Sequence, residues 1–317
     1  MGFNNRVFGC VVVKSINSNY NADFSHQPRT LPDGTVYATD KALKYAIKNY
    51  LKDMYEDERI FYFKRFDPDF KPLSLDEAYA AMFPDHAEEK NKSIVATDIL
   101  SCLDIRLFGA TFAKKGRAKD SNVAISIHGP VQINHGVNVW HENNIYSEQI
   151  MSPFRNPKAK DEEEGKSDAS TLGRQSKLQE GHYLHHFSIN PANLRDVLEK
   201  AGEGARGLSD ADIAKFKEAI CKGVTYYDSA AKAGTDNELT IWIQLKEGSK
   251  IVFPNINSLI TIDKLTKENG KMVFDLSEVS ALVNKYAGEV EKYEVYYQKE
   301  NTIVKNGPEP EHHFDLN

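Results

Sequence analysis

Apolar and polar positions along the first part of the chain predict a strand, a polar loop and a helix. Residues 6–14 (RVFGCVVVK) form an apolar, β-branched run, typical of a strand covered on both faces. Residues 15–35 are rich in Asn, Pro and Gly and predict a loop. In residues 39–52 apolar side chains recur at i, i+3, i+4, i+7 and i+8, which predicts an amphipathic helix with Thr39 as its N-cap. These apolar residues are Leu43, Ala46, Ile47, Tyr50 and Leu51.

The middle of the chain predicts another helix, a half-buried strand and two irregular segments. Apolar side chains on one face predict a helix over residues 94–108, which Gly109 is well placed to end. Residues 123–134 (VAISIHGPVQIN) alternate apolar and polar side chains, which predicts a strand with one polar, open face. Residues 53–92 are charged and aromatic and predict an irregular insertion. Residues 155–181 have so little apolar content that we expect a mobile excursion, ordered only by a partner.

The last part of the chain completes a recognisable order of elements. Two strands and two helices are predicted there, the strands over 182–190 and 239–246 and the helices over 209–224 and 277–291. Ser209 and Asp212 are spaced as a capping box at the start of the first of these helices. The order strand, helix, strand, strand, helix, strand predicts an α+β fold of the ferredoxin-like or RRM-like (RNA-recognition-motif) βαββαβ type.

The chain is acidic overall, yet the helix predicted over residues 39–52 gathers lysine on one face. The 317 residues carry 40 Lys and Arg against 46 Asp and Glu, a formal net charge of −6. Lys41, Lys44, Lys48 and Lys52 fall within about 80° of one another, opposite the apolar arc. We expect no carboxylate partner at i+4, so these charges repel by about 0.2–0.5 kcal/mol per pair unless an anion neutralises them. Such a lysine row is usually only a solvated helix face. The adjacent loop with Asn and Arg instead favours contacts of these lysines with phosphates.

The sequence predicts no metal site and no cofactor. The histidines follow no metal-ligand spacing, and no nucleophile motif, phosphate-binding loop or dinucleotide motif occurs. Cys10, Cys102 and Cys221 are far apart, which fits a reduced cytoplasmic protein with buried thiols. No apolar run approaches the roughly 18 residues of a membrane span, so we expect no membrane contact.

Several short blocks, in order along the chain, resemble one family, the CRISPR-associated Cascade backbone subunits. They are NRVFGCVVVK (5–14), the NSNYNAD…QPR loop (17–29), ATDKALKYAIKNYL (38–51), DIRLFGA (104–110), HGPVQI (128–133), QIMSPF (149–154) and TLGRQ…GHYLHHF (171–187). The pattern is closest to the type I-B version of this crRNA-binding family of the RAMP superfamily. Two blocks depart from it: the first loop usually reads NPNGDP, and an Arg usually follows GPVQ.

The resemblance implies an RRM-like palm with two large insertions. It places the palm at residues 1–52 (first strand and helix), 123–141 (second strand) and 182–262 (remaining strands and helix). A fingers insertion would occupy residues 53–122 and a thumb insertion residues 142–181. Residues 263–317 would form a C-terminal extension that packs on the palm.

The resemblance also implies a non-catalytic, multi-copy role. Copies of such a subunit stack helically along a CRISPR RNA (crRNA), bind its backbone and support pairing of the guide with a target DNA strand. The expected partners are therefore crRNA, target DNA, further copies of the chain and other Cascade subunits, while a separate helicase-nuclease degrades the target. Guide binding of this kind must ignore sequence and so should contact phosphates.

Twelve residues are carried into the expected RNA site. Matching the family pattern, Arg29 and Lys44 are the first candidates for guide contacts and Lys41 and Lys48 the next. The others are placed near the guide, at the thumb base, in the polar loop or on polar strand faces: Arg106, Phe108, Arg174, Gln175, Asn17, Asn19, Gln132 and His182.

Two other functions stay open at this point. Relatives in the same superfamily cut RNA, and Asp23 or His26 in the first loop would be catalytic in an endoribonuclease of that kind, although Asp23 also suits an Asx-turn. The other alternative is a generic single-stranded RNA chaperone without fixed stoichiometry.

Overall fold

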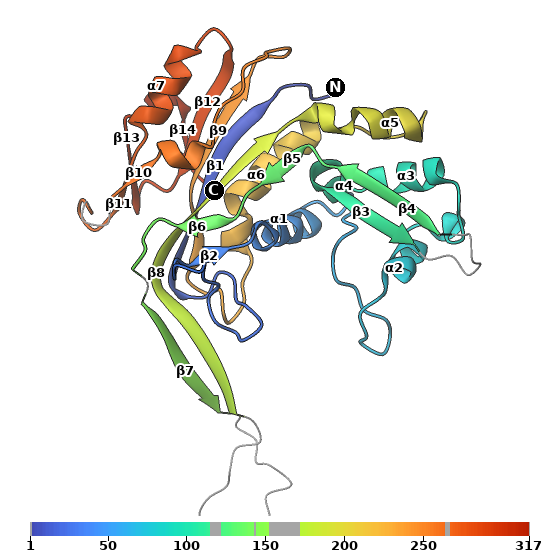
Figure 1. Ribbon diagram of the computed structural model, residues 1–317, viewed down its shortest axis with the longest axis horizontal. Coiled ribbons are helices and arrows are strands. Elements are labelled where there is room, and N and C mark those ends of the chain that lie inside the picture. Colours follow the sequence, from blue (N-terminus) through green and yellow to red (C-terminus); the bar gives the residue numbers. More distant parts are fainter. Residues whose placement is uncertain (1, 115–121, 143, 152–171, 264–266, 317) are drawn as a thin grey trace, which may run out of the picture.

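The computed structural model describes residues 2–114, 122–142, 144–151, 172–263 and 267–316. Within these residues a nine-stranded sheet runs through the molecule (Figure 1). Its strands are β1 (Val7–Ser18), β2 (Tyr37–Ala38), β5 (Val131–Ile133), β6 (Gly136–Asn138), β7 (Ile145–Met151), β8 (Leu172–Ile189), β9 (Thr235–Leu245), β12 (Val290–Tyr297) and β14 (His313–Phe314). The strand order is β14-β12-β9-β1-β8-β6-β2, and β5 and β7 also pair with β8.

Two smaller sheets and a set of helices complete the described part of the chain. One sheet joins β3 (Gly109–Lys114) to β4 (Val123–His128), and the other contains β10 (Thr261–Ile262), β11 (Met272–Asp275) and β13 (Thr302–Lys305). The α-helices are α1 (Asp40–Met54), α2 (Leu75–Met82), α3 (Lys92–Leu100), α4 (Leu103–Phe108), α5 (Arg195–Ala201), α6 (Asp210–Tyr226) and α7 (Ser277–Lys285). Short 3-10 helices are η1 (Pro84–His86), η2 (Pro191–Leu194), η3 (Ile256–Leu259) and η4 (Pro310–His312).

The predicted α+β class is confirmed. Strand β1 lies between β8 and β9 and is antiparallel to both. The loop after β1 leads to β2, which pairs with β6, and α1 follows β2; the segment from α2 to β4 then precedes β5. Helices α5 and α6 lie between β8 and β9 in the chain. The first seven residues of β1, residues 7–13, are apolar or glycine and all are buried because both faces of the sheet are covered, as the sequence predicted. The strand continues through mostly polar residues to Ser18, beyond the predicted end.

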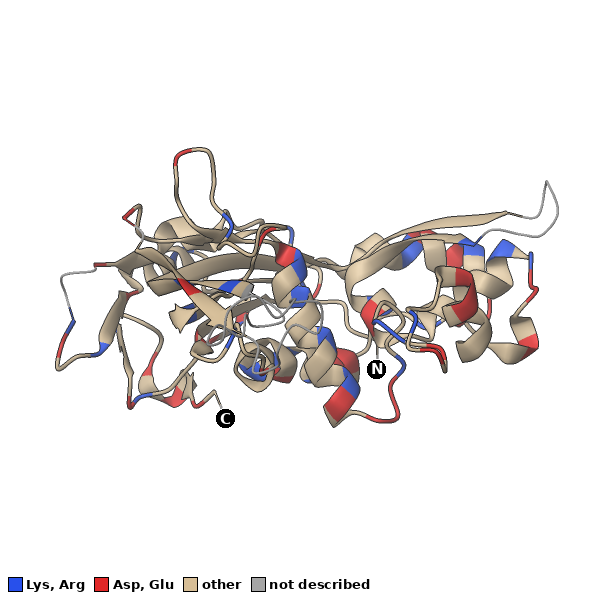
Figure 2. Cartoon of the chain, turned by 90° about the horizontal axis from the view of Figure 1, so that it is seen from below, with Lys and Arg blue, Asp and Glu red and all other residues tan. Residues whose placement is uncertain are grey.

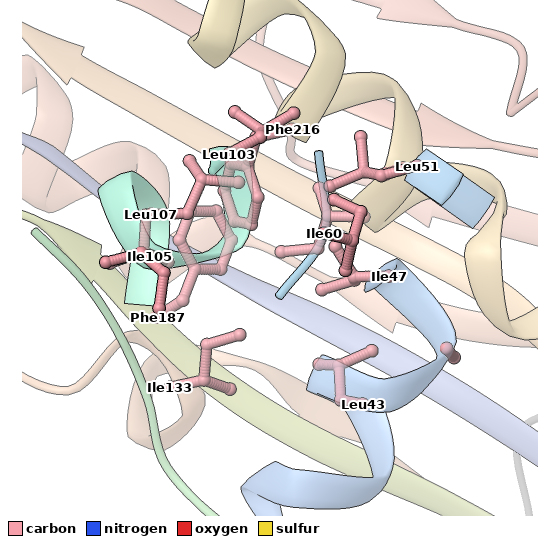
Figure 3. Packing of buried hydrophobic residues seen from close by; sticks show 14 of the residues in the cluster. Leu43, Ile47, Leu51, Ile60, Leu103, Ile105, Leu107, Ile133, Phe187 and Phe216 are labelled. Atoms are coloured by element: carbon pink, nitrogen blue, oxygen red, sulfur yellow. The ribbon is translucent and has the colours of Figure 1, made fainter. Parts of the chain in front are cut away.

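Helices α1 and α6 cover one face of this sheet. All five apolar residues predicted for the inner face of α1 are buried, and Figure 3 shows Leu43, Ile47 and Leu51 packed with side chains of α4, α6 and the sheet. The two helices approach closely at Gly223 of α6, where an added Cβ would lie 3.1 Å from the carbonyl oxygen of Ala46. A larger residue there would push α1 away from the sheet.

The other face of the sheet is covered by the C-terminal part of the chain. Phe8, Cys10 and Val12 of β1 join a second apolar cluster with side chains from η3, β11 and α7. Strand β9 is therefore buried almost throughout rather than half-exposed, although its sequence alternates. The three cysteines are free and buried, as predicted.

The predicted helix over residues 94–108 is two helices. Helix α3 ends at Leu100 and α4 begins at Leu103, with Ser101 and Cys102 between them. Apolar spacing alone could not reveal this break, because the expected inner-face residues on both sides of it are buried. Gly109 ends α4 as predicted, with φ at +71°, a conformation that favours glycine.

The predicted strand over residues 123–134 is also two elements in two sheets. Strand β4 pairs only with β3 among the described strands, whereas β5 pairs with β8 in the main sheet. Gly129 and Pro130 separate them, consistent with the bulge that Pro130 suggested. The expected irregular insertion over 53–92 contains α2, whose start is fixed by a capping box between Ser74 and Glu77.

The expected excursion over residues 155–181 was partly wrong. Residues 152–171 lie outside the described part of the chain, but β8 already begins at Leu172 and pairs with β7 in register from Ile145↔Leu178 to Met151↔Leu172. Figure 1 shows this hairpin extending away from the rest of the sheet. Backbone pairing with β7 and β1, together with burial of Leu178, gives residues 172–181 their regular structure.

Among the described residues, every helix is too short or too polar to span a lipid bilayer.

Candidate nucleic-acid interface

The loop after β1 sets where helix α1 begins. Thr39 is the N-cap, as predicted, but its side chain makes no capping bond to the helix. Instead, Oδ1 of Asn21 accepts hydrogen bonds from the backbone N (3.0 Å) and Oγ1 (3.1 Å) of Thr39. The loop thereby fixes the position of the first turn of α1 and of the lysines on it.

Lys41 and Lys44 lie together at the start of α1. The side chain of Lys41 is 84% exposed and that of Lys44 is 19% exposed. The Nζ atom of Lys44 lies 3.0 Å from Oδ2 of Asp40 and 5.6 Å from the centre of the Phe108 ring. The expectation of no carboxylate at i+4 was therefore wrong, because Asp40 occupies that place for Lys44. Burial disfavours the charge of Asp40, but the hydrogen bond and charge of Lys44, with smaller contributions from Lys41 and His135, lower its pKa.

Lys48 and Lys52 are occupied by contacts within the chain. The Nζ atom of Lys48 donates to the backbone oxygen of Tyr62 at 2.7 Å, and burial lowers the pKa of Lys48 against the opposing charge of Asp104. Lys52 pairs with Asp53. Lys48 therefore holds the segment after α1 in place, and it is removed from the exposed lysine row that the sequence predicted.

The polar loop holds its three candidate residues in different ways. Asn17 is exposed and accepts a hydrogen bond from the Tyr146 hydroxyl of β7 at 3.2 Å. Asn19 is buried and donates to the backbone oxygen of Ser176 in β8 at 3.1 Å, so it anchors the loop instead of facing a ligand. Nε of Arg29 is buried and, within the described residues, has no hydrogen-bond partner. Of the three, Arg29 has an unused donor.

Arg106 is not a surface residue, which corrects the placement implied by the DIRLFG block. Its side chain is fully buried and forms a bidentate pair with Asp212 of α6, at 3.1 Å from Nε and 2.7 Å from Nη2. It also donates to the backbone oxygens of Leu100 and Ser101 and to Glu58 at 3.3 Å. All its donors are used inside the protein, so Arg106 is a structural residue that ties α4 to the start of α6.

Phe108 lies next to Lys44 of α1, and Gln132 is linked to Phe108 through the backbone of Gly129. The ring of Phe108 packs 6.1 Å from that of Phe216, centre to centre, and lies beneath Nζ of Lys44. Gln132 is exposed and donates to the backbone oxygen of Gly129 at 2.8 Å. The backbone of Gly129 in turn touches that of Phe108, where an added Cβ would lie only 2.1 Å away.

His135 also belongs to this surface, although the sequence did not single it out as a contact. Its side chain is 51% exposed, with Nδ1 3.6 Å from Oδ1 of Asp40 and the ring centre 5.5 Å from that of Tyr37. In the sequence it follows directly after the HGPVQIN block. We call the set Lys41, Lys44, Phe108, Gln132 and His135 the α1 face. Figure 2 shows that Lys and Arg alternate with Asp and Glu over the helices in view, so the cationic surface is local.

Arg174 and Gln175 lie on the β7–β8 hairpin, outside the α1 face. Arg174 is exposed and pairs in register with Gln149 of β7. Gln175 donates from Nε2 to the backbone oxygen of Ala230 at 3.0 Å, which joins the hairpin to the segment before β9.

His182 is buried, so its expected contact with RNA is corrected. Its side chain is fully buried, with Nδ1 bonded to Glu238 and Nε2 3.5 Å from Glu180. Its ring packs edge-on against Trp140 at 4.9 Å. Burial disfavours its charge, but the hydrogen bonds and charges of the two glutamates outweigh burial and raise the pKa of His182.

The pKa values of the two fully buried histidines of β8 are shifted in opposite directions from the ordinary histidine value. Burial lowers the pKa of His185 to about 4, whereas that of His182 is raised above 6.5. His182 therefore stabilises the fold fully below about pH 6.5, and this contribution disappears as pH rises through its folded pKa. The contribution of His185 to stability depends on pH in the opposite direction. The free energy of unfolding falls as pH drops from about 6.5 towards 4.

Titration of the histidine ring resonances by NMR measures both values. His182→Asn and His185→Asn each delete one signal and so assign it. A titration midpoint below pH 6.5 for the His182 resonance would contradict the ion pairs of His182 with the two glutamates.

Asp23 and His26, the residues of the endoribonuclease alternative, lie in a tight turn. Oδ1 of Asp23 accepts hydrogen bonds from the backbone N of Ser25 (2.8 Å) and of Gln27 (2.9 Å), which is the Asx-type turn that the sequence suggested. The Ser25 hydroxyl and these amides lower the pKa of Asp23. His26 is exposed, with φ at +64°. The turn accounts for the presence of Asp23 without a catalytic role.

The fold and the α1 face define an α+β protein with a small cationic and aromatic surface beside a sheet. Comparison with family profiles then names the family: the chain matches CRISPR-associated protein Cas7 over residues 5–302, and it belongs to this family. A comparison with curated proteins finds no match.

The comparison with solved structures finds, among others, two chains from CRISPR RNA-guided surveillance complexes, and the first of them has a similar fold. One, from a "CRISPR RNA-guided surveillance complex, pre-nicking", has a TM-score of 0.53 at 12% identity and covers 98% of this chain and 96% of its own. Another, from a "CRISPR RNA-guided surveillance complex", has a TM-score of 0.47 at 14% identity and covers 95% of each chain.

Proposed function

We propose that this chain is a multi-copy, RNA-binding backbone subunit of a type I CRISPR surveillance complex, closest to the type I-B version. Membership of the Cas7 family across residues 5–302 is the observation that carries the proposal. The solved chain with a similar fold and nearly equal length, which belongs to such a surveillance complex, supports it. The proposed partners are crRNA, a target DNA strand, further copies of the chain, other subunits and a separate helicase-nuclease.

In this proposal the α1 face binds the phosphates of the guide RNA. Lys41 is almost fully exposed, and Lys44 is held over Phe108 on a helix whose apolar side is locked into the core. Rigid point charges of this kind bind a backbone without reading bases. Arg29 joins them in this proposal because its side chain is only partly buried and its loop leads into α1, so the outer part of its guanidinium is available to a phosphate.

The proposed division into palm, fingers and thumb follows the layers of the fold. The sheet of β9, β1, β8 and β6 with α1 and α6 would be the RRM-like palm, and α2, α3, α4 and β3 would be the fingers. Strand β4, which the resemblance places in the palm from residue 123, would instead join the fingers, because it pairs with β3. The β7–β8 hairpin would be the base of the thumb, with Arg174 and Gln175 on it. An outward-pointing hairpin of this kind suits contact with a neighbouring copy.

A measurement of bound RNA tests the proposal directly. The protein, expressed together with a CRISPR array and purified, is expected to carry RNA at one discrete ratio of protein copies to RNA length, measured by native mass spectrometry. The ratio arises because each copy covers a fixed number of nucleotides. RNA of heterogeneous length with no fixed ratio would instead fit a generic RNA chaperone, and protein free of RNA would overturn the proposal.

A further inference from the structure

Two hairpins in different parts of the chain have the same hydrogen-bond pattern. Residues 21–29 and 65–73 each begin a turn with an aspartate, Asp23 and Asp67, whose backbone N donates to the carbonyl four residues later, at 2.8 and 2.9 Å. The backbone N three residues after each aspartate donates back to its carbonyl, at 3.2 and 3.1 Å. A β-bridge closes both turns, Ala22↔Pro28 in one and Phe66↔Pro72 in the other.

The aspartate side chain makes each turn rigid. Oδ1 of Asp67 accepts hydrogen bonds from the backbone N of Asp69 (2.9 Å) and of Lys71 (2.8 Å), as Oδ1 of Asp23 does at the equivalent positions. The base of hairpin 65–73 is held as well, because the guanidinium of Arg65 donates to the carbonyls of Ile60 and Phe61. Side chains at these tips are therefore presented by a fixed backbone.

The third residue after each aspartate has a positive φ, and in hairpin 65–73 this residue is aromatic. His26 has φ +64° and Phe70 has φ +60°. The left-handed region favours Gly, Asn and Asp, so a bulky residue held there is strained. The Phe70 side chain is 85% exposed, so packing against the rest of the chain does not offset this cost. Strain of this kind is characteristic of residues kept for function.

Exposed lysines flank the aromatic side chains of hairpin 65–73. Phe66 is 53% exposed, and Nζ of Lys64 lies 4.9 Å from the centre of its ring. Lys64 and Lys71 are exposed at either end, and the exposed Asp69 lies between the two aromatic residues in the sequence. The carboxylate of Asp67 is occupied by the turn amides, so two exposed lysines stand against one exposed carboxylate. Exposed aromatic rings flanked by lysine suit single-stranded nucleic acids, the rings by stacking on bases and the cations by contact with phosphates.

We propose that hairpin 65–73, with Lys64, is a second nucleic-acid site that binds an unpaired nucleotide. Phe70 stacks on the base, and Lys64 and Lys71 contact the adjacent phosphates. The segment between α1 and α2, which carries the hairpin, extends to the same side of the molecule as the β7–β8 hairpin (Figure 1). The site is separate from the α1 face and uses none of its residues, so either site can fail without the other.

The test compares binding of the full chain to matched oligonucleotides. Fluorescence anisotropy is measured with 15-nucleotide oligo(U), oligo(dT) and a fully abasic deoxyribose oligomer. Phe70→Gly removes the ring and relieves the positive φ, so we expect a higher melting temperature together with weaker binding. Loss of stacking on one base corresponds to about a fivefold to 150-fold rise in Kd. Phe70→Tyr should retain wild-type affinity, and Val252→Ala, another exposed apolar position at 66%, should change nothing.

The abasic oligomer separates stacking from general attraction. The Phe70→Gly variant should bind it as the wild type does, since no base is present to stack. If Phe70→Gly weakens binding of oligo(U) alone, the site binds RNA, and if it weakens binding of oligo(dT) alone, the site binds DNA. Weaker binding of both means that the site accepts a nucleotide of either kind. Equal binding of wild type and Phe70→Gly to all three oligomers overturns the proposal. Unchanged binding with weaker self-association in light scattering assigns Phe70 to a contact between copies and also overturns it.

Discussion

The double variant Lys41→Glu, Lys44→Glu is expected to lose affinity for guide RNA by a similar factor for every guide sequence. Both residues lie in the first turns of α1, and only phosphate contacts lose energy uniformly across sequences. A charge-assisted hydrogen bond contributes about 1.5–3 kcal/mol, so each lost contact should raise Kd by about ten- to a hundredfold. The slope of log affinity against log salt should also fall by about 0.7 for each lost contact with a single strand.

A matched control lies on the same helix. Lys52→Glu makes the same change of charge at one position, but Lys52 is paired with Asp53 near the end of α1, away from the α1 face. We expect its RNA affinity to stay within about twofold of the wild type. Filter binding with two unrelated guide sequences, at several salt concentrations, measures both quantities. An unchanged Kd for the double variant would remove the α1 face from RNA binding.

The double variant should fold nearly as well as the wild type. Loss of the i,i+4 pair between Lys44 and Asp40 costs about 0.3–0.5 kcal/mol, and repulsion of Asp40 by the carboxylate introduced at position 44 costs a similar amount, together about 1 kcal/mol. Thermal unfolding checks this. A large fall in melting temperature would mean that the loss of RNA binding reflects unfolding, and Lys41→Glu alone then provides the test, since Lys41 is 84% exposed.

The second large effect is expected on stability, from Arg106→Ala. This change leaves Asp212 buried without its bidentate partner and leaves the carbonyls of Leu100 and Ser101 without a donor. Burial disfavours the charge of Asp212, but the hydrogen bonds and charge of Arg106 outweigh it and lower its pKa. Removing one partner of a buried pair typically costs about 3–5 kcal/mol. We expect a loss of that size in the free energy of unfolding, measured by urea denaturation.

Lys215→Ala is the matched control for Arg106→Ala. Nζ of Lys215 lies 2.7 Å from the same Glu58, and the Lys215 side chain is 19% exposed. In the described part of the chain Lys215 does not pair with Asp212, so it does not tie α4 to α6 as Arg106 does. Its loss should cost about 1 kcal/mol or less. If Arg106 were a guide contact, Arg106→Ala would instead weaken RNA binding with little loss of stability, and that outcome would contradict its structural role.

Local patterns along the chain were sufficient to predict the elements that position the α1 face. The apolar spacing of α1, the capping box of α6 and the apolar run of β1 all appear in the fold as predicted. Such patterns depend on periodicity and on caps within a few residues, so they can be read from sequence. The break between α3 and α4 and the division of residues 123–134 between two sheets could not, because tertiary pairing decides them.

The sequence by itself determined the fold class, the inner face of α1 and the presence of four lysines on its other side. Only the tertiary structure decided which of the candidate residues are free. Lys48 is bound to the backbone of Tyr62, Arg106 to Asp212 and His182 to Glu238, and each partner lies 14 or more positions away in sequence. The sequence does not distinguish a lysine, arginine or histidine that faces a polyanion from one that pairs with a buried carboxylate. The difference is set by burial and by distant partners, which appear only when the chain is folded.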